Sequence, residues 1–226
     1  KNQIKKFPRH KIIFLLNTPE EFHYFKSKGI NCRFINHNAF VDPNIFKPIN
    51  CKKEYDIIYN GRLEILKRHY LLKSCKNISL LSASVLKSDH SKIKYLNFLK
   101  KIIPNAEILN FDFPKKLNQL SSFEDIPILD PRGVSNAINK ARIGVILSYK
   151  EGACYASMEY LLSGLPIVST ANIGGRDIFF DNRFCKTSLS NTYSIKKTIS
   201  SLLNDNIPSD FIRSVTLNNI QLHINK

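Results

Sequence analysis

The sequence predicts a doubly wound α/β fold, in which helices cover both faces of a mainly parallel sheet. Short apolar runs typical of buried strands alternate with amphipathic segments typical of helices along the 226 residues. The stretch 143–177 shows this order most clearly: an apolar run, an acidic turn, a helical pattern, a break at Gly164-Leu165-Pro166 and a second apolar run. Ligands of open parallel sheets bind at the carboxyl ends of the strands, so we expect the function to lie after Leu147 and after Thr170.

Residues 1–48 are predicted to hold the end of a first α/β domain and a linker. An apolar run at 11–16 predicts a strand. The sequence Thr-Pro-Glu-Glu from Thr18 predicts a helix start, because threonine caps a helix, proline suits its first turn and acids favour its dipole. A second strand is expected at 30–35. Residues 37–48 are rich in asparagine and proline, which predicts a loop that ends this unit.

Residues 49–208 are predicted to form the main sheet domain, and residues 209–226 a C-terminal helical segment. The polar region 114–131, which contains several prolines, is expected to be irregular. The first expected strand begins at Tyr55, and the others cover 78–85, 106–111, 143–147 and 167–170. The expected helices cover 67–75, 91–103, 134–141, a segment from about Ala153, and 194–203.

The formal net charge of +16, with a pI of about 9.7, is the most unusual bulk property of the chain. Such a charge suits nucleic acid, an anionic membrane surface or phosphorylated small molecules. Lysines also alternate with apolar residues at 91–103, as they do on ordinary solvated helix faces. The aromatic residues lie mostly in apolar strand patterns and not among the basic residues, so we do not expect a nucleic-acid partner.

The cysteine and histidine patterns favour a cytoplasmic protein without a metal site. The five cysteines are widely spaced and include no CxxC pair, which suits reduced thiols. The six histidines do not fall at metal-ligand spacing. No apolar run approaches the ~20 residues that a membrane-spanning helix needs. Neither an initial methionine nor a hydrophobic leader is present, so we interpret the sequence as a partial chain.

Two acids near the helix predicted from about Ala153 form the first candidate site. Glu151 lies in the loop before this helix, and Glu159 lies about two turns inside it, at most roughly 12 Å away. Two such acids can hold the hydroxyl-bearing ends of one extended ligand. The free N–H groups of residues 152–155 (Gly152, Ala153, Cys154 and Tyr155) and the helix dipole suit a phosphate or diphosphate between them. An ordinary acid near a helix start plus a surface glutamate would give the same pattern.

Gly61, Arg62 and Lys67 form the second candidate site. Gly61 ends a predicted strand, where a ligand can approach the backbone, and the two cations could clamp phosphates. Cations near a helix start oppose its dipole, which suggests that an anion is expected there. The loop Gly174-Gly175-Arg176-Asp177 is a third candidate, since glycine permits close backbone approach, although a plain turn would use glycine as well.

Taken in order, these motifs resemble the donor-binding half of the GT-B glycosyltransferases, in particular the large retaining group called family 4. Residues 38–48 resemble the linker "NGVD…F.P" between the two Rossmann-like domains of that family, and Asn60-Gly61-Arg62-Leu63 with Lys67 resembles its "GRL…K" clamp. Residues 151–159 match its E-x7-E signature, and residues 164–168 match "G.PVV". Two departures suggest a subgroup: Arg68 stands where glycine is usual, and Asp177 comes one position earlier than the common glutamate.

The resemblance implies roles for the candidate residues. Arg62 and Lys67 would hold the diphosphate of a nucleotide sugar, Glu151 the hydroxyls of the transferred sugar, and Glu159 the ribose. Amides near Ala153 and Cys154 would face the phosphates. Cations and amides would stabilise the charge that develops on the leaving diphosphate, so the family needs neither a metal nor another cofactor.

The sequence thus predicts a retaining, hexosyltransferase-like enzyme of glycan biosynthesis, with residues 1–48 as the remnant of the acceptor-side domain. The acceptor would be a glycan or a lipid-linked molecule, and the protein would be cytoplasmic, with peripheral membrane contact as an open possibility. Because most of the acceptor domain is missing, the isolated chain is expected to be inactive. The alternatives left open are a non-catalytic glycosyltransferase-like interaction protein and a basic nucleic-acid-binding module.

Overall fold

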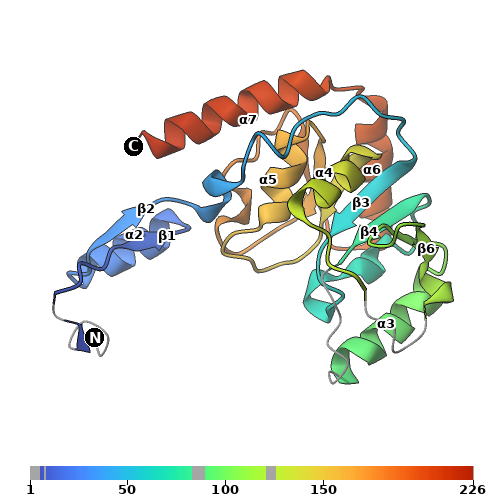
Figure 1. Ribbon diagram of the computed structural model, residues 1–226, viewed down its shortest axis with the longest axis horizontal. Helices are drawn as coiled ribbons and strands as arrows, with labels where there is room; N and C mark the ends of the chain where they lie inside the picture. Colours follow the sequence, from blue (N-terminus) through green and yellow to red (C-terminus); the bar gives the residue numbers. More distant parts are fainter. Residues whose placement is uncertain (1–5, 8, 83–89, 121–125, 226) are drawn as a thin grey trace.

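The computed structural model describes residues 6–7, 9–82, 90–120 and 126–225. Its main body is a seven-stranded sheet in the order β6-β5-β4-β3-β7-β8-β9, and a small unit at the N-terminus projects away from it (Figure 1). All neighbouring strands pair in parallel except β5 and β6, which are antiparallel. The strands are β3 (Tyr55–Asn60), β4 (Ile78–Leu81), β5 (Glu107–Ile108), β6 (Lys115–Lys116), β7 (Ala141–Ile146), β8 (Ile167–Thr170) and β9 (Cys185–Ser188).

Both faces of this sheet are buried, as the near-continuous apolar runs of its central strands predict. Successive residues of β3 point to opposite faces, so Ile57 and Ile58 belong to separate core clusters. The first cluster is completed by α3 (His90–Ile102) and α6 (Thr192–Asn204), and the second by α4 (Pro131–Asn139), α5 (Tyr155–Leu162) and α7 (Ser209–Ile224). Helices therefore cover both faces, and the predicted doubly wound fold is confirmed.

The predicted helix at 67–75 is wrong. Two 3₁₀ turns, η2 (Ile65–Lys67) and η3 (His69–Leu72), replace it. Arg68 separates them in the left-handed conformation, with φ 55°. The Tyr59 hydroxyl also donates a hydrogen bond to the Lys67 carbonyl at 2.5 Å, so this carbonyl is held by strand β3 and not by a helix ladder.

Several boundaries also differ from prediction. The strands expected at 30–35 and 106–111 are shorter, β6 and η4 (Leu117–Gln119) lie in the region expected to be irregular, and β9 was not predicted. Helix α4 starts three residues earlier than expected because Asp130 caps it by accepting a hydrogen bond from the Gly133 amide at 2.6 Å. Residues 83–85 of the expected strand 78–85, and residues 121–125 of the polar region, lie outside the described residues.

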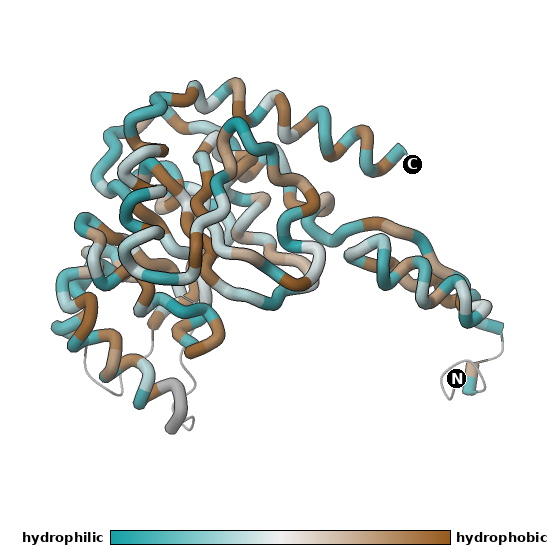
Figure 2. Tube along the Cα trace, turned by 180° about the vertical axis from the view of Figure 1, so that it is seen from behind, coloured by the Kyte–Doolittle hydropathy of each residue, from teal (hydrophilic) through white to brown (hydrophobic). Residues whose placement is uncertain are grey.

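The N-terminal unit consists of β1 (Phe14–Leu16), α2 (Pro19–Ser27) and β2 (Cys32–Phe34), with the two strands parallel. Thr18 caps α2 by accepting a hydrogen bond from the Glu21 amide, as expected. None of the residues of α2 is buried, and hydrophobic positions run along this unit outside the main body (Figure 2). The division of the chain into domains stays a prediction.

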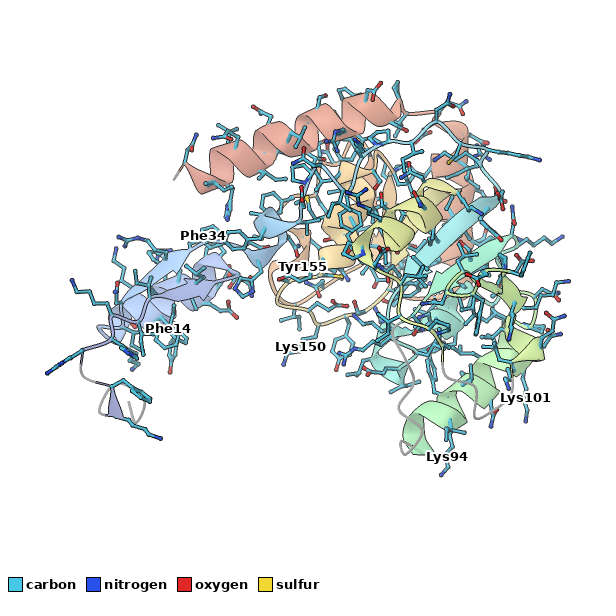
Figure 3. All side chains as sticks on the ribbon, viewed as in Figure 1. Phe14, Phe34, Lys94, Lys101, Lys150 and Tyr155 are labelled. Carbon is cyan, nitrogen blue, oxygen red and sulfur yellow. The ribbon has the colours of Figure 1, made fainter. Side chains whose placement is uncertain are left out.

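The linker and the last helix bind the N-terminal unit to the main body. The linker contains η1 (His37–Phe40), and Arg213 of α7 donates hydrogen bonds of 2.7 Å to the carbonyls of Pro43 and Phe46. At the far end of α7, the His223 ring accepts a hydrogen bond from the Asn36 amide at 3.0 Å and packs edge-on against Phe34, which Figure 3 places at this junction. In the part of the chain that is described, no helix combines the length and apolar character needed to cross a bilayer.

Candidate functional site

The carboxyl ends of β3, β7 and β8 meet at one edge of the sheet, here called the carboxyl edge. The loops after β7 and β8 continue side by side beyond the strands. The Ile173 amide donates to the Tyr149 carbonyl at 2.8 Å, and the Glu151 amide donates to the Ile173 carbonyl at 3.2 Å and to the Asn172 side chain at 2.9 Å. These bonds hold the loop with the first predicted acid firmly in place.

The two glycines after β8 are required by close backbone packing. A Cβ atom on Gly174 would lie 2.2 Å from the Glu151 carbonyl oxygen. A Cβ atom on Gly175 would lie 2.2 Å from the Asn17 carbonyl oxygen and 2.5 Å from that of Gly152. Gly174 also has φ 125°, which favours glycine. In this chain the glycines therefore let the two loops and the N-terminal segment approach one another.

Lys67 and Glu151, which come from the two main candidate sites, are in direct contact. Lys67 Nζ lies 2.6 Å from Glu151 Oε1, and only 17% and 12% of the two side chains are exposed. The Ser148 hydroxyl donates a second hydrogen bond to the same carboxylate oxygen. Burial acts to raise the pKa of Glu151, but the hydrogen bonds from Lys67 and Ser148 and the charge of Lys67 outweigh it and hold that pKa below its ordinary value. The Glu151 carboxylate is therefore ionised at neutral pH.

Gly61 belongs to this group, whereas the Arg62 side chain points to solvent. A Cβ atom on Gly61 would lie 3.7 Å from Lys67 Cδ, so the end of β3 lies beside the lysine. The Arg62 side chain is 63% exposed and lies 3.4 Å from Glu64. The structure brings Lys67 and Glu151 together, but it does not place Arg62 in their pair.

Glu159, in helix α5, contacts Asn60, the last residue of β3. Asn60 donates a hydrogen bond from its side-chain amide to Glu159 Oε2 at 2.7 Å, and its backbone amide donates to the Tyr160 hydroxyl at 2.5 Å. Burial raises the pKa of Glu159 to about 7, and the hydrogen bond from Asn60 offsets this only in part. The two acids thus differ in environment: Glu151 has a cationic partner and Glu159 an amide.

The N-terminus of α5 provides free amides beside the ion pair. The helix begins at Tyr155, slightly later than expected, and the side chain of Tyr155 is exposed at this rim (Figure 3). The Cys154 amide donates to Asn38 Oδ1 at 2.9 Å, so it already has a protein partner. The amides of Gly152, Ala153 and Tyr155 make no hydrogen bond to any residue that the structure describes. Three of the four predicted amides are thus available to an anion.

Cys154 and His69 do not have the ionisation that reactive groups need. Burial raises the pKa of the Cys154 thiol to about 12, so a thiolate is not formed near neutral pH. Burial lowers the pKa of His69 to about 3, so its ring is neutral. The His69 ring packs on Tyr59 with a centroid distance of 4.3 Å and lies 3.3 Å from the Tyr95 hydroxyl. His69 therefore supports the end of β3 as a packed core residue.

Arg176 holds the two loops of this edge together, a role that no motif in the sequence indicates. Its side chain is fully buried, and it donates hydrogen bonds to the Ser148 carbonyl at 2.5 Å and the Thr170 carbonyl at 2.6 Å. Two further bonds, of 2.5 and 3.0 Å, reach the carboxylate of Asp177. One feature of the sequence could have indicated this role: Asp177 directly follows Arg176 after the diglycine at the end of a strand. An arginine with an adjacent carboxylate partner can be buried at lower cost.

Comparisons with known proteins give structural neighbours only. No protein-family model matches the sequence, and a search of curated proteins gives no significant match. Among solved structures, sucrose-phosphate synthase from Thermosynechococcus elongatus aligns with 94% of this chain and 53% of its own, at 14% identity and a TM-score of 0.67. A glycosyltransferase from Rickettsia africae aligns with 100% of this chain and 65% of its own, at 16% identity and a TM-score of 0.66.

HepE from Anabaena is a third neighbour, with a TM-score of 0.67, 14% identity, and coverage of 97% of this chain and 61% of its own. The chain thus spans 53–65% of the length of these three structures. Identity of 14–16% carries information about the fold alone. Over the aligned region, the chain has the GT-B fold of these glycosyltransferase structures.

Proposed function

We propose that this chain carries the donor site of a glycosyltransferase that uses a nucleotide diphosphate sugar. The observation that supports this most directly is the buried Lys67–Glu151 pair, at 2.6 Å, beside the free amides before α5. A cation, a carboxylate and open N–H groups at the carboxyl edge of a parallel sheet suit a ligand that combines phosphates with hydroxyls. The structural neighbour HepE was crystallised with UDP and with UDP-glucose, which agrees with this ligand class.

In the proposed complex, Lys67 and the amides of Gly152, Ala153 and Tyr155 bind the diphosphate. Arg62, whose side chain is exposed, turns toward the same phosphates. Glu151 accepts hydrogen bonds from the hydroxyls of the transferred sugar, and Glu159 accepts from the ribose. Gly61 leaves room for the ligand next to the end of β3. The cation and the amides stabilise the charge that develops on the leaving diphosphate, without a metal ion.

The reaction proposed is transfer of a hexose with retention at the anomeric carbon, to a glycan or lipid-linked acceptor. We propose that the acceptor side is provided by a part of the protein beyond this chain. The chain aligns with only 53–65% of the length of the three neighbours, which agrees with this proposal. We further propose a cytoplasmic location with peripheral membrane contact, and we expect the isolated chain to bind the donor without transferring the sugar.

Calorimetry with UDP, GDP and ADP tests the donor site. We expect one of the three to bind wild-type protein, and Lys67→Ala to weaken that binding about 10–100-fold because a charge-assisted contact to phosphate is lost. The matched control is Lys140→Ala, since Lys140 is also paired with a glutamate, at 3.5 Å from Glu54, but lies at the other edge of the sheet. Absence of binding to all three nucleotides, or equal losses in both variants, would contradict the proposal.

A further inference from the structure

Backbone carbonyl groups at the carboxyl edge affect how well this edge can bind a diphosphate. Backbone carbonyl oxygens carry a partial negative charge, so carbonyls left open in the loops at this edge would repel an anion bound beside them. In this chain, guanidinium groups cover the carbonyls nearest the ion pair. Arg68 Nε donates to Leu147 O at 2.5 Å, and Arg176 donates to Ser148 O at 2.5 Å and to Thr170 O at 2.6 Å.

The backbone of Arg68 has a conformation that arginine seldom adopts. Its φ of 55° is left-handed, and it lies between the two 3₁₀ turns. A non-glycine residue stays in this region only when its surroundings hold it there. Here the side chain supplies the restraints: Nη2 donates to the Thr170 hydroxyl at 2.6 Å and Nη1 to the Ser190 hydroxyl at 3.3 Å, while the guanidinium lies 5.6 Å from the Tyr149 ring centroid.

The charge balance distinguishes Arg68 from Lys67, Arg62 and Arg176. Lys67 is paired with Glu151, Arg62 with Glu64 and Arg176 with Asp177, so a carboxylate compensates each of them. Arg68 contacts one carbonyl, two hydroxyls and a ring, and no carboxylate of the described residues pairs with it. Arg68 is therefore a positive charge without a carboxylate partner, on the residue next to the phosphate-binding lysine.

We propose that Arg68 is the residue that makes the carboxyl edge attractive to a diphosphate, which rests on the proposed donor site. Arg68 acts as a positioning and electrostatic residue. It donates a hydrogen bond to the Leu147 carbonyl, holds the ends of β7 and β8 to the turn that carries Lys67, and adds a net positive charge that the three paired cations do not supply. The expected ligand selectivity follows from charge: a nucleoside diphosphate gains more from Arg68 than a monophosphate does, and a nucleoside gains nothing.

The test compares Arg68→Gln and Arg68→Lys with wild type. Calorimetry is run for the diphosphate that binds wild type, among UDP, GDP and ADP, and for the matching monophosphate and nucleoside. We expect Arg68→Gln to weaken diphosphate binding about tenfold, the effect of one charge roughly 10 Å away at an effective dielectric near 20. The loss for the monophosphate should be smaller, the nucleoside should be unaffected, and Arg68→Lys should restore most of the diphosphate affinity. The salt dependence of diphosphate binding should also become weaker in Arg68→Gln.

Two controls separate this role from a loss of folding. Arg142→Gln removes the same charge at the opposite edge of the sheet and should leave the diphosphate affinity unchanged. Arg68→Gly removes the charge but relieves the left-handed backbone, so it should fold at least as well as Arg68→Gln while binding as weakly. Equal weakening for all three ligands in Arg68→Gln, or full diphosphate affinity in Arg68→Gly, would overturn the role of Arg68. If wild type binds no nucleotide at all, the donor site itself is wrong.

Discussion

The two edges of the main sheet carry charged residues in different ways. At the carboxyl edge, Lys67 and Glu151 are 2.6 Å apart with 17% and 12% of their side chains exposed. At the amino edge, where β3 and β7 begin, the Lys140–Glu54 and Arg142–Asp56 pairs are each separated by 3.5 Å, with 35–43% of each side chain exposed. The first pair is held out of water by its surroundings, whereas the second and third are ordinary surface pairs.

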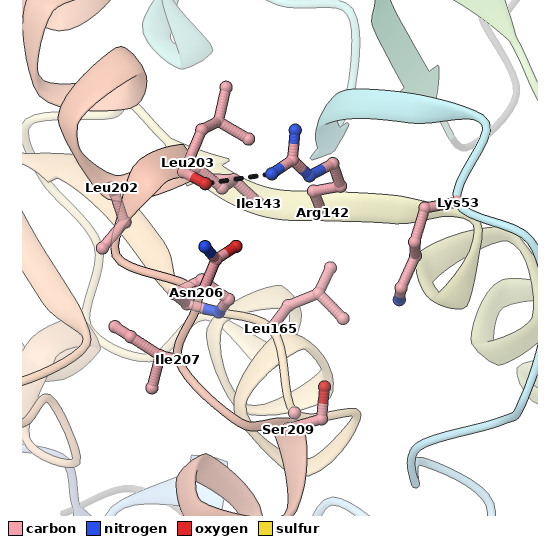
Figure 4. Close-up of a pocket in the computed structure, with 11 residues that line it drawn as sticks. Lys53, Arg142, Ile143, Leu165, Leu202, Leu203, Asn206, Ile207 and Ser209 are labelled. Atoms are coloured by element: carbon pink, nitrogen blue, oxygen red, sulfur yellow. Dashed lines mark hydrogen bonds between the residues drawn. The ribbon is translucent and has the colours of Figure 1, made fainter.

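The amino edge nevertheless has a well-formed hollow. A cavity of about 160 Å³ lies there, with Arg142 bonded to the Leu203 carbonyl at 2.9 Å on one side and Leu165 and Ile207 below it (Figure 4). Its two cations already have protein partners: Lys53 donates to the Asn139 carbonyl at 2.7 Å, and Arg142 also faces Asp56. Buried charge beside unused hydrogen-bonding groups, and not the shape of the surface, therefore supports the proposed site at the carboxyl edge.

The largest effect should come from Arg176. Arg176→Met should lower the free energy of unfolding by about 3–5 kcal/mol, because it leaves the Asp177 carboxylate and the carbonyls of Ser148 and Thr170 without their partner inside the protein. Urea denaturation measures this change. Arg142→Met, at the amino edge, should cost less than about 1 kcal/mol. Similar losses for both variants would show that the two edges do not differ in the way described.

Double-mutant cycles on the two lysine–glutamate pairs should give a smaller, still clear difference. For Lys67→Met and Glu151→Gln we expect a coupling energy of roughly 2–3 kcal/mol, since either single change leaves a partly buried charge unpaired. For Lys140→Met and Glu54→Gln the coupling should stay below about 1 kcal/mol. Unfolding curves of the single and double variants supply both values. Coupling as strong at the amino edge as at the carboxyl edge would refute the comparison.

The pH dependence of stability should reveal the environment of Glu159. Burial raises the pKa of this carboxyl from 4.5 to about 7, so between these pH values the folded protein holds more of its proton than the unfolded chain does. The contribution of Glu159 to stability is therefore fully present below pH 4.5 and decreases as the pH rises toward about 7. In Glu159→Gln this decrease should vanish, and in Glu54→Gln it should persist. Parallel curves for wild type and Glu159→Gln would rule out the raised pKa.

The smallest effect is expected at the cavity of the amino edge. Arg142→Ala removes a half-exposed guanidinium that lines this hollow, and its cost to the free energy of unfolding should not exceed about 1 kcal/mol. Nucleotide affinity, measured by calorimetry, should equal that of wild type. A tenfold loss of affinity in this variant would move the binding site to the amino edge.

The features that could be predicted from the sequence are those that depend on the local pattern of residues. Apolar runs gave the order of strands and helices, and the spacing of charged residues around Gly61 and Glu151 pointed to one edge of the sheet. The ion pair itself joins residues 84 positions apart and was not visible in any single motif. The resemblance to a known family placed both residues in one site.

Side chains that bond to distant main-chain groups could not be predicted. Arg68 is hydrogen-bonded to the Leu147 carbonyl, 79 positions away in the sequence, and Asn38 to the Cys154 amide, 116 positions away. Such bonds leave no periodicity in the sequence. Contacts of this kind also explain the wrong helix at 67–75. The apolar pattern there is compatible with a helix, but the bond from Tyr59 to the Lys67 carbonyl and the bonds of Arg68 to Leu147 and Thr170 favour the two 3₁₀ turns.

The central claim is that the carboxyl edge, and not the hollow at the amino edge, binds the nucleotide. A crystal structure of the chain with the nucleoside diphosphate that binds it most tightly tests this claim most directly. We predict that the diphosphate lies between Lys67 Nζ and the amides of Gly152, Ala153 and Tyr155, within hydrogen-bonding distance of both. Density for the nucleotide in the cavity lined by Lys53 and Arg142, with Lys67 still paired only with Glu151, would contradict it.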